Sequence, residues 1–254
     1  MVEISILIDA DIDTEGKPIV ISTITQKMLS ALLEAIASHP SPSINYPSNE
    51  KIQPIAPASV IVRSVLNLEE YLNSNHNYSS ENQDNKNIIF CPLTLNIPSN
   101  LPFPGQQVYQ ICRDVIQLRQ QVAAMGYATG NGLLWLPIVL TAKGALYGEA
   151  IGVSSPSFSP NSDDITYYQP VHLSDYQRQD LYKLAYKLLK SISAPPATYL
   201  MQFSATPNIC FDKLWPFPAP PALASLPVQK PDLFTCHWYC LRHWPILDLQ
   251  ILKK

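Results

Sequence analysis

Apolar residues recur along the chain with two periods, and these periods predict its secondary structure. Spacings of three and four residues predict three main helices, at 25–38, 106–125 and 174–192. The third begins with Ser174 and Gln177, a pair typical of a capping box. Short apolar or alternating runs predict strands at 3–12, 19–24, 59–65, 88–95, 133–141, 145–152, 198–203, 208–214, 234–241 and 246–252.

One almost wholly polar stretch interrupts this pattern. Residues 73–87 are predicted to form a mobile surface loop. The elements before it are too few to close a core of their own, so we interpret 1–254 as a single globular domain. Strands outnumber helices and several strands follow one another through short turns. The predicted fold class is therefore α+β, with a mixed, mostly antiparallel sheet and about three main helices.

Composition narrows the functional classes. The net charge is −3 and the 17 Lys and Arg are scattered, so no basic stripe favours nucleic acid as a partner. The longest apolar run, 133–140, is too short to span a membrane. The first residues lack the basic region and the long apolar stretch that are typical of a secretory signal. The five cysteines lie mostly in apolar segments, as reduced thiols do. We expect a soluble, cytoplasmic protein with no membrane span.

A cluster of potential zinc ligands lies near the end of the chain. Cys236, His237, Cys240 and His243 fall within eight residues. On the predicted strand the cysteines and histidines would point to opposite faces, and the two cysteines would lie about 13 Å apart. Only a helix or a loop would gather them. We therefore expect structural cysteines and histidines, and no metal.

Alternating aspartates follow the first strand. Asp9, Asp11 and Asp13 begin like a calcium-binding loop, but Thr14 and Val20 stand where a glycine and a carboxylate would be needed. A solvated turn is the simpler interpretation, and a magnesium site that uses Asp9 and Asp11 is the alternative.

A glycine-rich stretch, 126–132, follows the second main helix. Phosphate-binding loops run from a strand into a helix, which is the reverse of the order predicted here. A helix C-cap and turn is the favoured interpretation.

The most distinctive segment is Trp215–Pro221, which contains two large aromatic residues and four prolines. Such a segment either lies as a rigid strap on its own core or offers an extended surface to a partner. As a contact surface it would present Trp215, Phe217, Pro218 and Pro220, with Trp238 nearby.

The order of elements from 168 to 222 resembles the closing segment of the ATP-grasp ligases. The corresponding pieces are a helix at 174–192, strands at 198–203 and 209–214, and a proline-containing turn at 215–218. The resemblance implies ATP and Mg²⁺ as cofactors, with the metal held by an acid on the first strand and an acid or amide on the second.

Several of these family residues are not retained. Gln202 best matches the acid of the first strand, and Asp212 or Lys213 matches the residue of the second. Phe217 stands where the family tends to have an arginine between prolines. Losing a carboxylate and a cation would remove electrostatic stabilisation that phosphoryl transfer requires.

Three functions remain open at this point. No complete catalytic set is visible, so the leading hypothesis is a non-catalytic binding or accessory protein that acts on a protein partner and needs no cofactor. The first alternative is an ATP- and Mg-dependent ligase-like enzyme, with Asp212, Asp9 and Asp11 as metal contacts and Lys143 as a phosphate contact. The second is an RNA-associated α+β module that stacks bases on aromatic side chains.

Overall fold

The computed structural model describes residues 2–12, 18–39, 59–66, 68, 87–154, 165–206 and 208–252. Contacts within the chain divide it into two compact units, Met1–Phe103 and Pro104–Lys254. The predicted loop at 73–87 lies outside the described residues except for Asn87, which begins a strand. The prediction of a single domain over 1–254 stays a prediction.

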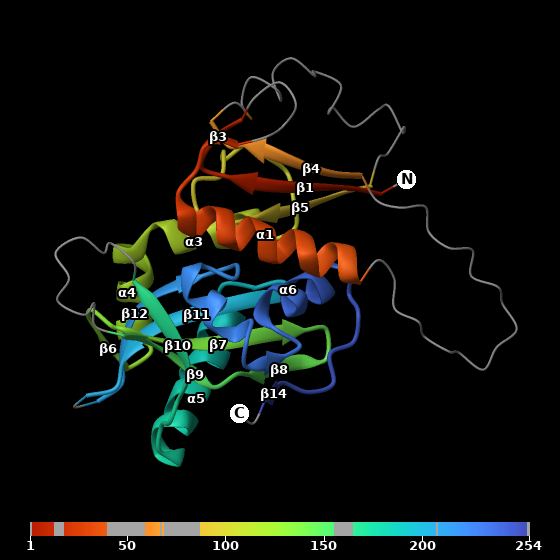
Figure 1. Cartoon of the computed structure of the whole chain (residues 1–254). Coiled ribbons are helices and arrows are strands. Elements are labelled where there is room, and N and C mark those ends of the chain that lie inside the picture. The colour runs from red at the N-terminus through yellow and green to blue at the C-terminus, as the bar shows by residue number, and fades with distance from the viewer. Residues whose placement is uncertain are drawn as a thin grey trace, which may run out of the picture. The chain divides into compact units, whose positions relative to one another are not determined.

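The first unit contains a parallel three-stranded sheet. Its elements are β1 (Val2–Ile8), β2 (Asp11–Ile12), β3 (Pro18–Val20), α1 (Thr23–Ser38), β4 (Ser59–Ser64) and β5 (Asn87–Pro92). The strand order is β4-β1-β5, and α1 runs alongside this sheet (Figure 1). The isoleucines of β1 are fully buried, as in a central parallel strand.

Two local predictions for this unit need correction. The strands predicted at 3–12 and 19–24 pair with each other only through the short β2–β3 ladder, because β1 pairs with β4 and β5 instead. Helix α1 begins after Ser22, whose side chain accepts a hydrogen bond from the backbone N–H of Thr25. The chain thus enters the helix two residues before the start that the sequence pattern predicted, residue 25.

The second unit is built on a seven-stranded sheet. Its elements are α3 (Gln106–Arg113), α4 (Val115–Ala124), β6 (Ala128–Thr129), β7 (Leu134–Thr141), β8 (Gly144–Tyr147), β9 (Ala150–Ser154), β10 (Thr166–Val171), α5 (Asp175–Ser191), β11 (Ala197–Ser204), β12 (Cys210–Trp215), η2 (Pro220–Ser225), β13 (Gln229–Lys230), α6 (Leu233–Leu241) and β14 (Gln250–Ile251). The order is β10-β9-β7-β11-β12-β6, with β8 paired to β7. Only the β12–β6 pair is parallel, so the predicted α+β class with a mixed, mostly antiparallel sheet is confirmed.

The predicted helix 106–125 is broken in two. Asp114 is both the C-cap of α3 and the N-cap of α4. Its carboxylate accepts a hydrogen bond from the backbone N–H of Gln117 in the first turn of α4. The apolar stripe continues across the break because Cys112, Leu118 and Val122 are all fully buried. Helix α4 packs against β12, and this contact positions the candidate site described below.

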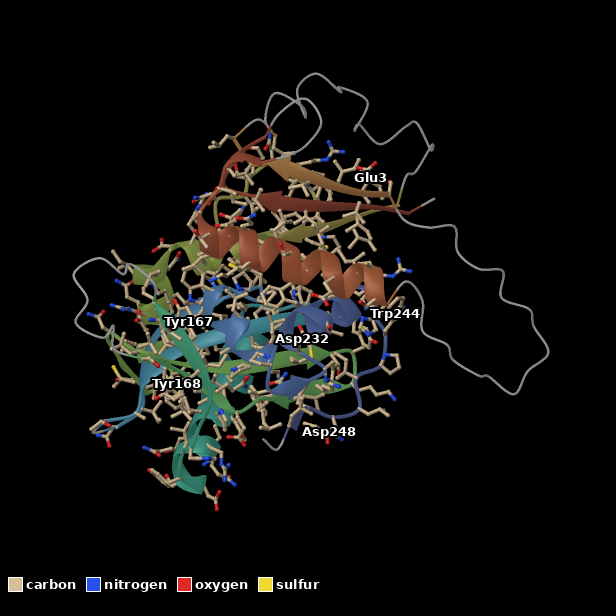
Figure 2. The ribbon with its side chains drawn as sticks, viewed as in Figure 1. Glu3, Tyr167, Tyr168, Asp232, Trp244 and Asp248 are labelled. Atoms are coloured by element: carbon tan, nitrogen blue, oxygen red, sulfur yellow. The ribbon has the colours of Figure 1, made fainter. Side chains whose placement is uncertain are left out.

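The strand predicted at 234–241 is wrong, because these residues form helix α6. Asp232 caps it by accepting hydrogen bonds from the N–H groups of Phe234 and Thr235. Figure 2 labels Asp232, the N-cap of this helix, and Trp244, which follows its C-terminal end. The helix packs on β11 and β7 with nearly every side chain buried, so its all-round apolar sequence lacks the stripe by which helices are recognised.

The helix brings Cys236 and Cys240 onto neighbouring turns, yet the described residues contain no group of three or more potential metal ligands. Burial raises the pKa of the Cys240 thiol to about 12, and that of Cys236 well above its ordinary value. In the absence of a metal, both side chains are therefore thiols at neutral pH.

Acid sensitivity is expected from His237. This imidazole is buried, accepts a hydrogen bond from the backbone N–H of Thr198, and has its pKa lowered by burial to about 3. The unfolded chain, with an ordinary histidine pKa near 6.5, binds a proton that the folded chain does not. The free energy of unfolding is therefore unaffected by His237 protonation above about pH 6.5, and it decreases as the pH falls from about 6.5 to about 3.

We therefore expect wild type to lose about 2 kcal/mol more unfolding free energy than His237→Asn between pH 7 and pH 5. Urea unfolding at several pH values measures this difference. His172→Asn, at an exposed histidine, is the control and should track wild type. Parallel pH profiles for wild type and His237→Asn would contradict the assignment.

Candidate functional site

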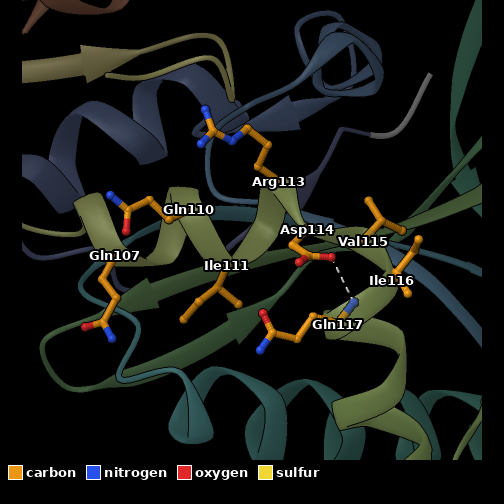
Figure 3. A pocket seen from close by; sticks show the side chains of 8 residues that line it. All are labelled: Gln107, Gln110, Ile111, Arg113, Asp114, Val115, Ile116 and Gln117. Atoms are coloured by element: carbon orange, nitrogen blue, oxygen red, sulfur yellow. Dashed lines mark hydrogen bonds between the residues drawn. The ribbon is translucent and has the colours of Figure 1, made fainter. Parts of the chain in front are cut away.

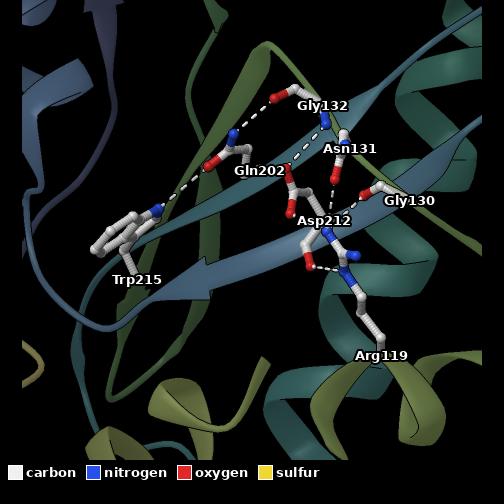
Figure 4. A network of polar contacts seen from close by, with 7 residues as sticks. All are labelled: Arg119, Gly130, Asn131, Gly132, Gln202, Asp212 and Trp215. Carbon is white, nitrogen blue, oxygen red and sulfur yellow. Dashed lines mark hydrogen bonds and ion pairs between the residues drawn. The ribbon is translucent and has the colours of Figure 1, made fainter. Parts of the chain in front are cut away.

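A polar network lies where β11, β12, α4 and the β6–β7 loop meet. Its origin is a register shift between β11 and β12: Gln202 is opposite Lys213 and Phe203 is opposite Phe211. Asp212 is therefore an extra residue in β12, as in a β-bulge. Bulges re-aim side chains, and here the bulge carries a carboxylate toward the loop. The Asp212 network consists of Arg119, Gly130, Asn131, Gly132, Gln202, Asp212 and Trp215 (Figure 4).

Both oxygens of the Asp212 carboxylate are occupied. Arg119 of α4 donates from Nη2 to Oδ1 at 2.5 Å, and the backbone N–H of Gly132 donates to Oδ2 at 2.9 Å. Arg119 also donates to the backbone carbonyls of Asp212 and Gly130. The Asp212 side chain is only 8% exposed, so this pairing compensates for the burial of its charge.

Gln202 is held at both ends of its amide. Its Nε2 donates to the carbonyl of Gly132 at 2.6 Å, and its Oε1 accepts from the indole Nε1 of Trp215 at 3.5 Å. A Cβ on Gly132 would lie 2.1 Å from the carbonyl carbon of Phe203. Only glycine lets the loop approach β11 this closely, so Gly132 positions both the loop and Gln202.

Lys213 adds a positive charge beside this network. It lies directly across from Gln202, so the two side chains share a face of the sheet, and Trp215, two residues further on, shares it too. The Lys213 ammonium lies 5.1 Å from the centroid of the Trp215 ring. Lys213 and Trp215 are both half-buried. This face thus combines an amide, an indole and an ammonium group.

The residues of the ligase-like alternative are not all brought together. Lys143 is exposed in the turn between β7 and β8, whereas Gln202 pairs with Trp135 at the opposite end of β7. Between Trp135 and Thr141 the strand spans roughly 20 Å. Lys143 and Asp212 therefore belong to different ends of the sheet.

The two aspartates of the alternative lie in the first unit. Asp9 is exposed and accepts hydrogen bonds from Thr94 and Asn96, whereas Asp11 is placed only through its backbone, opposite Val20 in the β2–β3 ladder. The part of the chain that the structure describes contains no group of three or more His, Cys, Asp or Glu that could hold a metal ion. The role of the two aspartates as metal contacts stays a prediction.

The aromatic and proline-rich segment lies as a strap on its own unit. Phe217 is 2% exposed and stacks on Tyr109 of α3, whose hydroxyl donates to the carbonyl of Pro216. Pro218 is buried and Pro220 is half-buried at the start of η2. Trp238 is 2% exposed, within α6. Of the residues predicted as a contact surface, Phe217, Pro218 and Trp238 are core residues, and Trp215 belongs to the Asp212 network.

A cavity of about 800 Å³ opens along α3 and α4 (Figure 3). Its lining is mainly glutamine and aliphatic, with Arg113 and Asp114 as the charged residues. The Asp114 carboxylate serves as the cap of α4. The sequence did not point to this cavity, and nothing in its lining resembles a set of metal ligands or a phosphate-binding loop.

Arg119 and Gly132 are two residues of the Asp212 network that sequence reasoning missed. Arg119 is one of two arginines on a predicted helix, and nothing local distinguishes it from Arg113. The signal for Gly132 was present: its glycine-rich stretch was interpreted as a turn, although such a residue also marks a close backbone approach. The partner, Phe203, is 71 positions away and could not be identified from the stretch alone.

Comparisons with known proteins identify the fold. No family model and no curated protein matches the sequence. Among solved structures, glycinamide-RNase-transformylase T from Mycobacterium tuberculosis matches with a TM-score of 0.64 and 13% identity, covering 98% of this chain and 82% of that one. N5-carboxyaminoimidazole synthetase from Staphylococcus aureus, complexed with ADP, matches with a TM-score of 0.67 and 9% identity, covering 99% and 80%.

An L-amino acid ligase from Bacillus licheniformis also matches, with a TM-score of 0.59 and 9% identity over 95% of this chain and 74% of that one. These neighbours are ATP-grasp enzymes, so the chain has an ATP-grasp-like fold, and the resemblance noted for 168–222 extends to the whole fold. The expectation of a protein-binding accessory protein is wrong, because the structures named above that share this fold are enzymes: a transformylase, a synthetase and a ligase. No helix among the described residues is long and apolar enough to cross a membrane.

The Asp212 network is expected to stabilise the fold. Asp212→Ala leaves the Arg119 guanidinium without its carboxylate and the Gly132 N–H without an acceptor, so the unfolding free energy should fall by about 3 kcal/mol. Chemical denaturation measures it. Asp175→Ala is the matched control, since Asp175 pairs with Arg178 but is 88% exposed, and its loss should be barely measurable. Equal effects for the two variants would contradict a structural role for the network.

Proposed function

We propose that this chain is a ligase-like protein that binds ATP. The observation that carries the proposal is the likeness of 95–99% of the chain to a synthetase determined with ADP and to an amino acid ligase. ATP-dependent ligation is the reaction class that these neighbours support. The proposal replaces the accessory role as the working hypothesis.

The phosphate end of the nucleotide is proposed to lie at the sheet face that carries Gln202 and Lys213. Lysine binds phosphate as a compact point charge, and Lys213 is half-buried next to an indole, where water screens its charge less than at the open surface. The corresponding strands are also those that carried the family resemblance in the sequence. Lys143, at the other end of β7, is the competing phosphate contact.

The RNA-associated alternative stays a prediction, as does the cytoplasmic location. Retention on RNA that weakens as the salt concentration rises would favour the RNA-associated alternative, because a protein that neutralises phosphates releases counterions. The net charge of −3 gives it no support.

Thermal unfolding with and without ATP tests the proposal. A ligand present at 100 times its dissociation constant stabilises the native state by about 2.7 kcal/mol. At about 2–4 °C for each kcal/mol, the midpoint should rise by roughly 5–10 °C. GTP at the same concentration is the comparison for base selectivity. An unchanged midpoint with millimolar ATP, with or without Mg²⁺, would contradict nucleotide binding.

Two lysine variants identify which end of β7 holds the phosphates. Lys213→Met should weaken ATP binding about tenfold, equivalent to about 1.4 kcal/mol, because it removes the charge and retains the apolar stem. Lys143→Met should leave the affinity unchanged. Isothermal titration calorimetry measures both. The opposite result would move the phosphate site to the β7–β8 turn.

A further inference from the structure

The resemblance to ATP-grasp ligases implies a magnesium ion, and the Asp212 network allows its fit to be tested. Mg²⁺ demands hard oxygen ligands in near-octahedral geometry, usually with one or two carboxylates of the protein. The resemblance noted for 168–222 implies that the strands that would hold this ion are β11 and β12. The relevant question is therefore which oxygens Gln202, Asp212 and Lys213 can offer.

Gln202 offers one neutral oxygen that already has a donor. Because Nε2 donates to the Gly132 carbonyl, the amide is oriented with Oε1 toward the Trp215 indole. Turning Oε1 away to meet a cation would break the contact with Trp215. Reversing the amide would set its oxygen against a carbonyl oxygen. Only 8% of Gln202 is exposed, so water could not compensate for either loss.

Asp212 offers no uncompensated charge. One oxygen receives the Arg119 guanidinium and the other receives the Gly132 N–H. A metal that took this carboxylate would leave a part-buried arginine without its counterion. Because Arg119 is also fixed by the carbonyls of Asp212 and Gly130, it is not positioned to move aside.

Lys213 places a permanent cation in the same neighbourhood. It is the cross-strand partner of Gln202, so a divalent ion on Gln202 would lie beside an ammonium group of like charge. The described residues contain no group of three or more His, Cys, Asp or Glu that could outweigh this repulsion. The donor set does not fit Mg²⁺.

We infer that this site binds the phosphates of a nucleotide without a divalent cation, and that the Lys213 ammonium supplies the positive charge there. The inference rests on the proposed nucleotide binding and adds its cation requirement. Phosphate oxygens prefer N–H donors and cations, and the face beside Gln202 provides a cation. Chelation of the metal should therefore leave binding intact.

Calorimetric titration of the full chain with ATP, once in EDTA and once in excess Mg²⁺, tests this requirement. The two dissociation constants should agree within about threefold, a difference of about 0.7 kcal/mol. A tenfold or greater gain on adding Mg²⁺ would overturn the inference and leave the proposed ATP binding standing. Absence of binding in both buffers would overturn both.

A charge-reversal variant tests the position of the cation. Lys213→Glu places a carboxylate opposite Gln202, so ATP binding in EDTA should fall more than tenfold, and Mg²⁺ should partly restore it. Lys213→Met is the neutral comparison: its affinity for ATP should be lower than that of wild type, and Mg²⁺ should not restore it. Lys190→Met removes another lysine that lies over an aromatic ring, that of Tyr186, and should bind as wild type does. Restoration of Lys213→Met by Mg²⁺ would show that the metal binds through other residues.

A titration with Mn²⁺ in the absence of nucleotide tests the donor set independently of ATP. Wild type should leave the electron paramagnetic resonance signal of free Mn²⁺ unchanged. Binding of one Mn²⁺ that is lost in Asp212→Asn would overturn the inference, whether or not ATP binds. Circular dichroism of Asp212→Asn confirms that the variant is folded when the comparison is made.

Discussion

The buried carboxylate of Asp212 is the constraint on which the arrangement of the second unit depends. Arg119 on α4 and Gly132 in the β6–β7 loop both point to it, although these residues come from separate parts of the chain. A charge that is only 8% exposed is costly unless every partner is in place. The helix, the loop and the β11–β12 pair are thus fixed together, and the face that carries Gln202 and Lys213 is fixed with them.

Sequence patterns predicted those elements whose signals are local. The capping box of Ser174 and Gln177 begins α5 as expected, and β7, β11 and β12 lie where their apolar runs predicted. Helix α6 was missed because its buried, all-round apolar sequence has no polar face, and its cap at Asp232 was not recognised. Strand β10 was not among the predicted strands, and the structure adds it at the edge of the sheet, paired with β9.

The candidate site was only partly predictable, because it is made by contacts that are distant in sequence. Gln202, Asp212 and Lys213 were identified through the resemblance to a family, whereas Arg119 and Gly132 became visible only in the structure. The Trp215–Pro221 segment shows the opposite case. Its composition suggested a surface for a partner, but Phe217 completes the packing of α3 instead. Composition describes a segment without specifying which side of it meets water.

The bulge at Asp212 has a consequence for how sequences of this fold are aligned. From the sequence, either Asp212 or Lys213 could match the family residue of the second strand. The register of β11 and β12 places Lys213, and not Asp212, opposite Gln202. If a related chain had one residue fewer between the positions of Phe211 and Leu214, an acid there would lie opposite the position of Gln202. That chain would lack the carboxylate to which Arg119 of α4 donates here. A single insertion or deletion would thereby exchange the sign of the charge at this face. Related chains should accordingly be grouped by the length of this strand before their residues are compared.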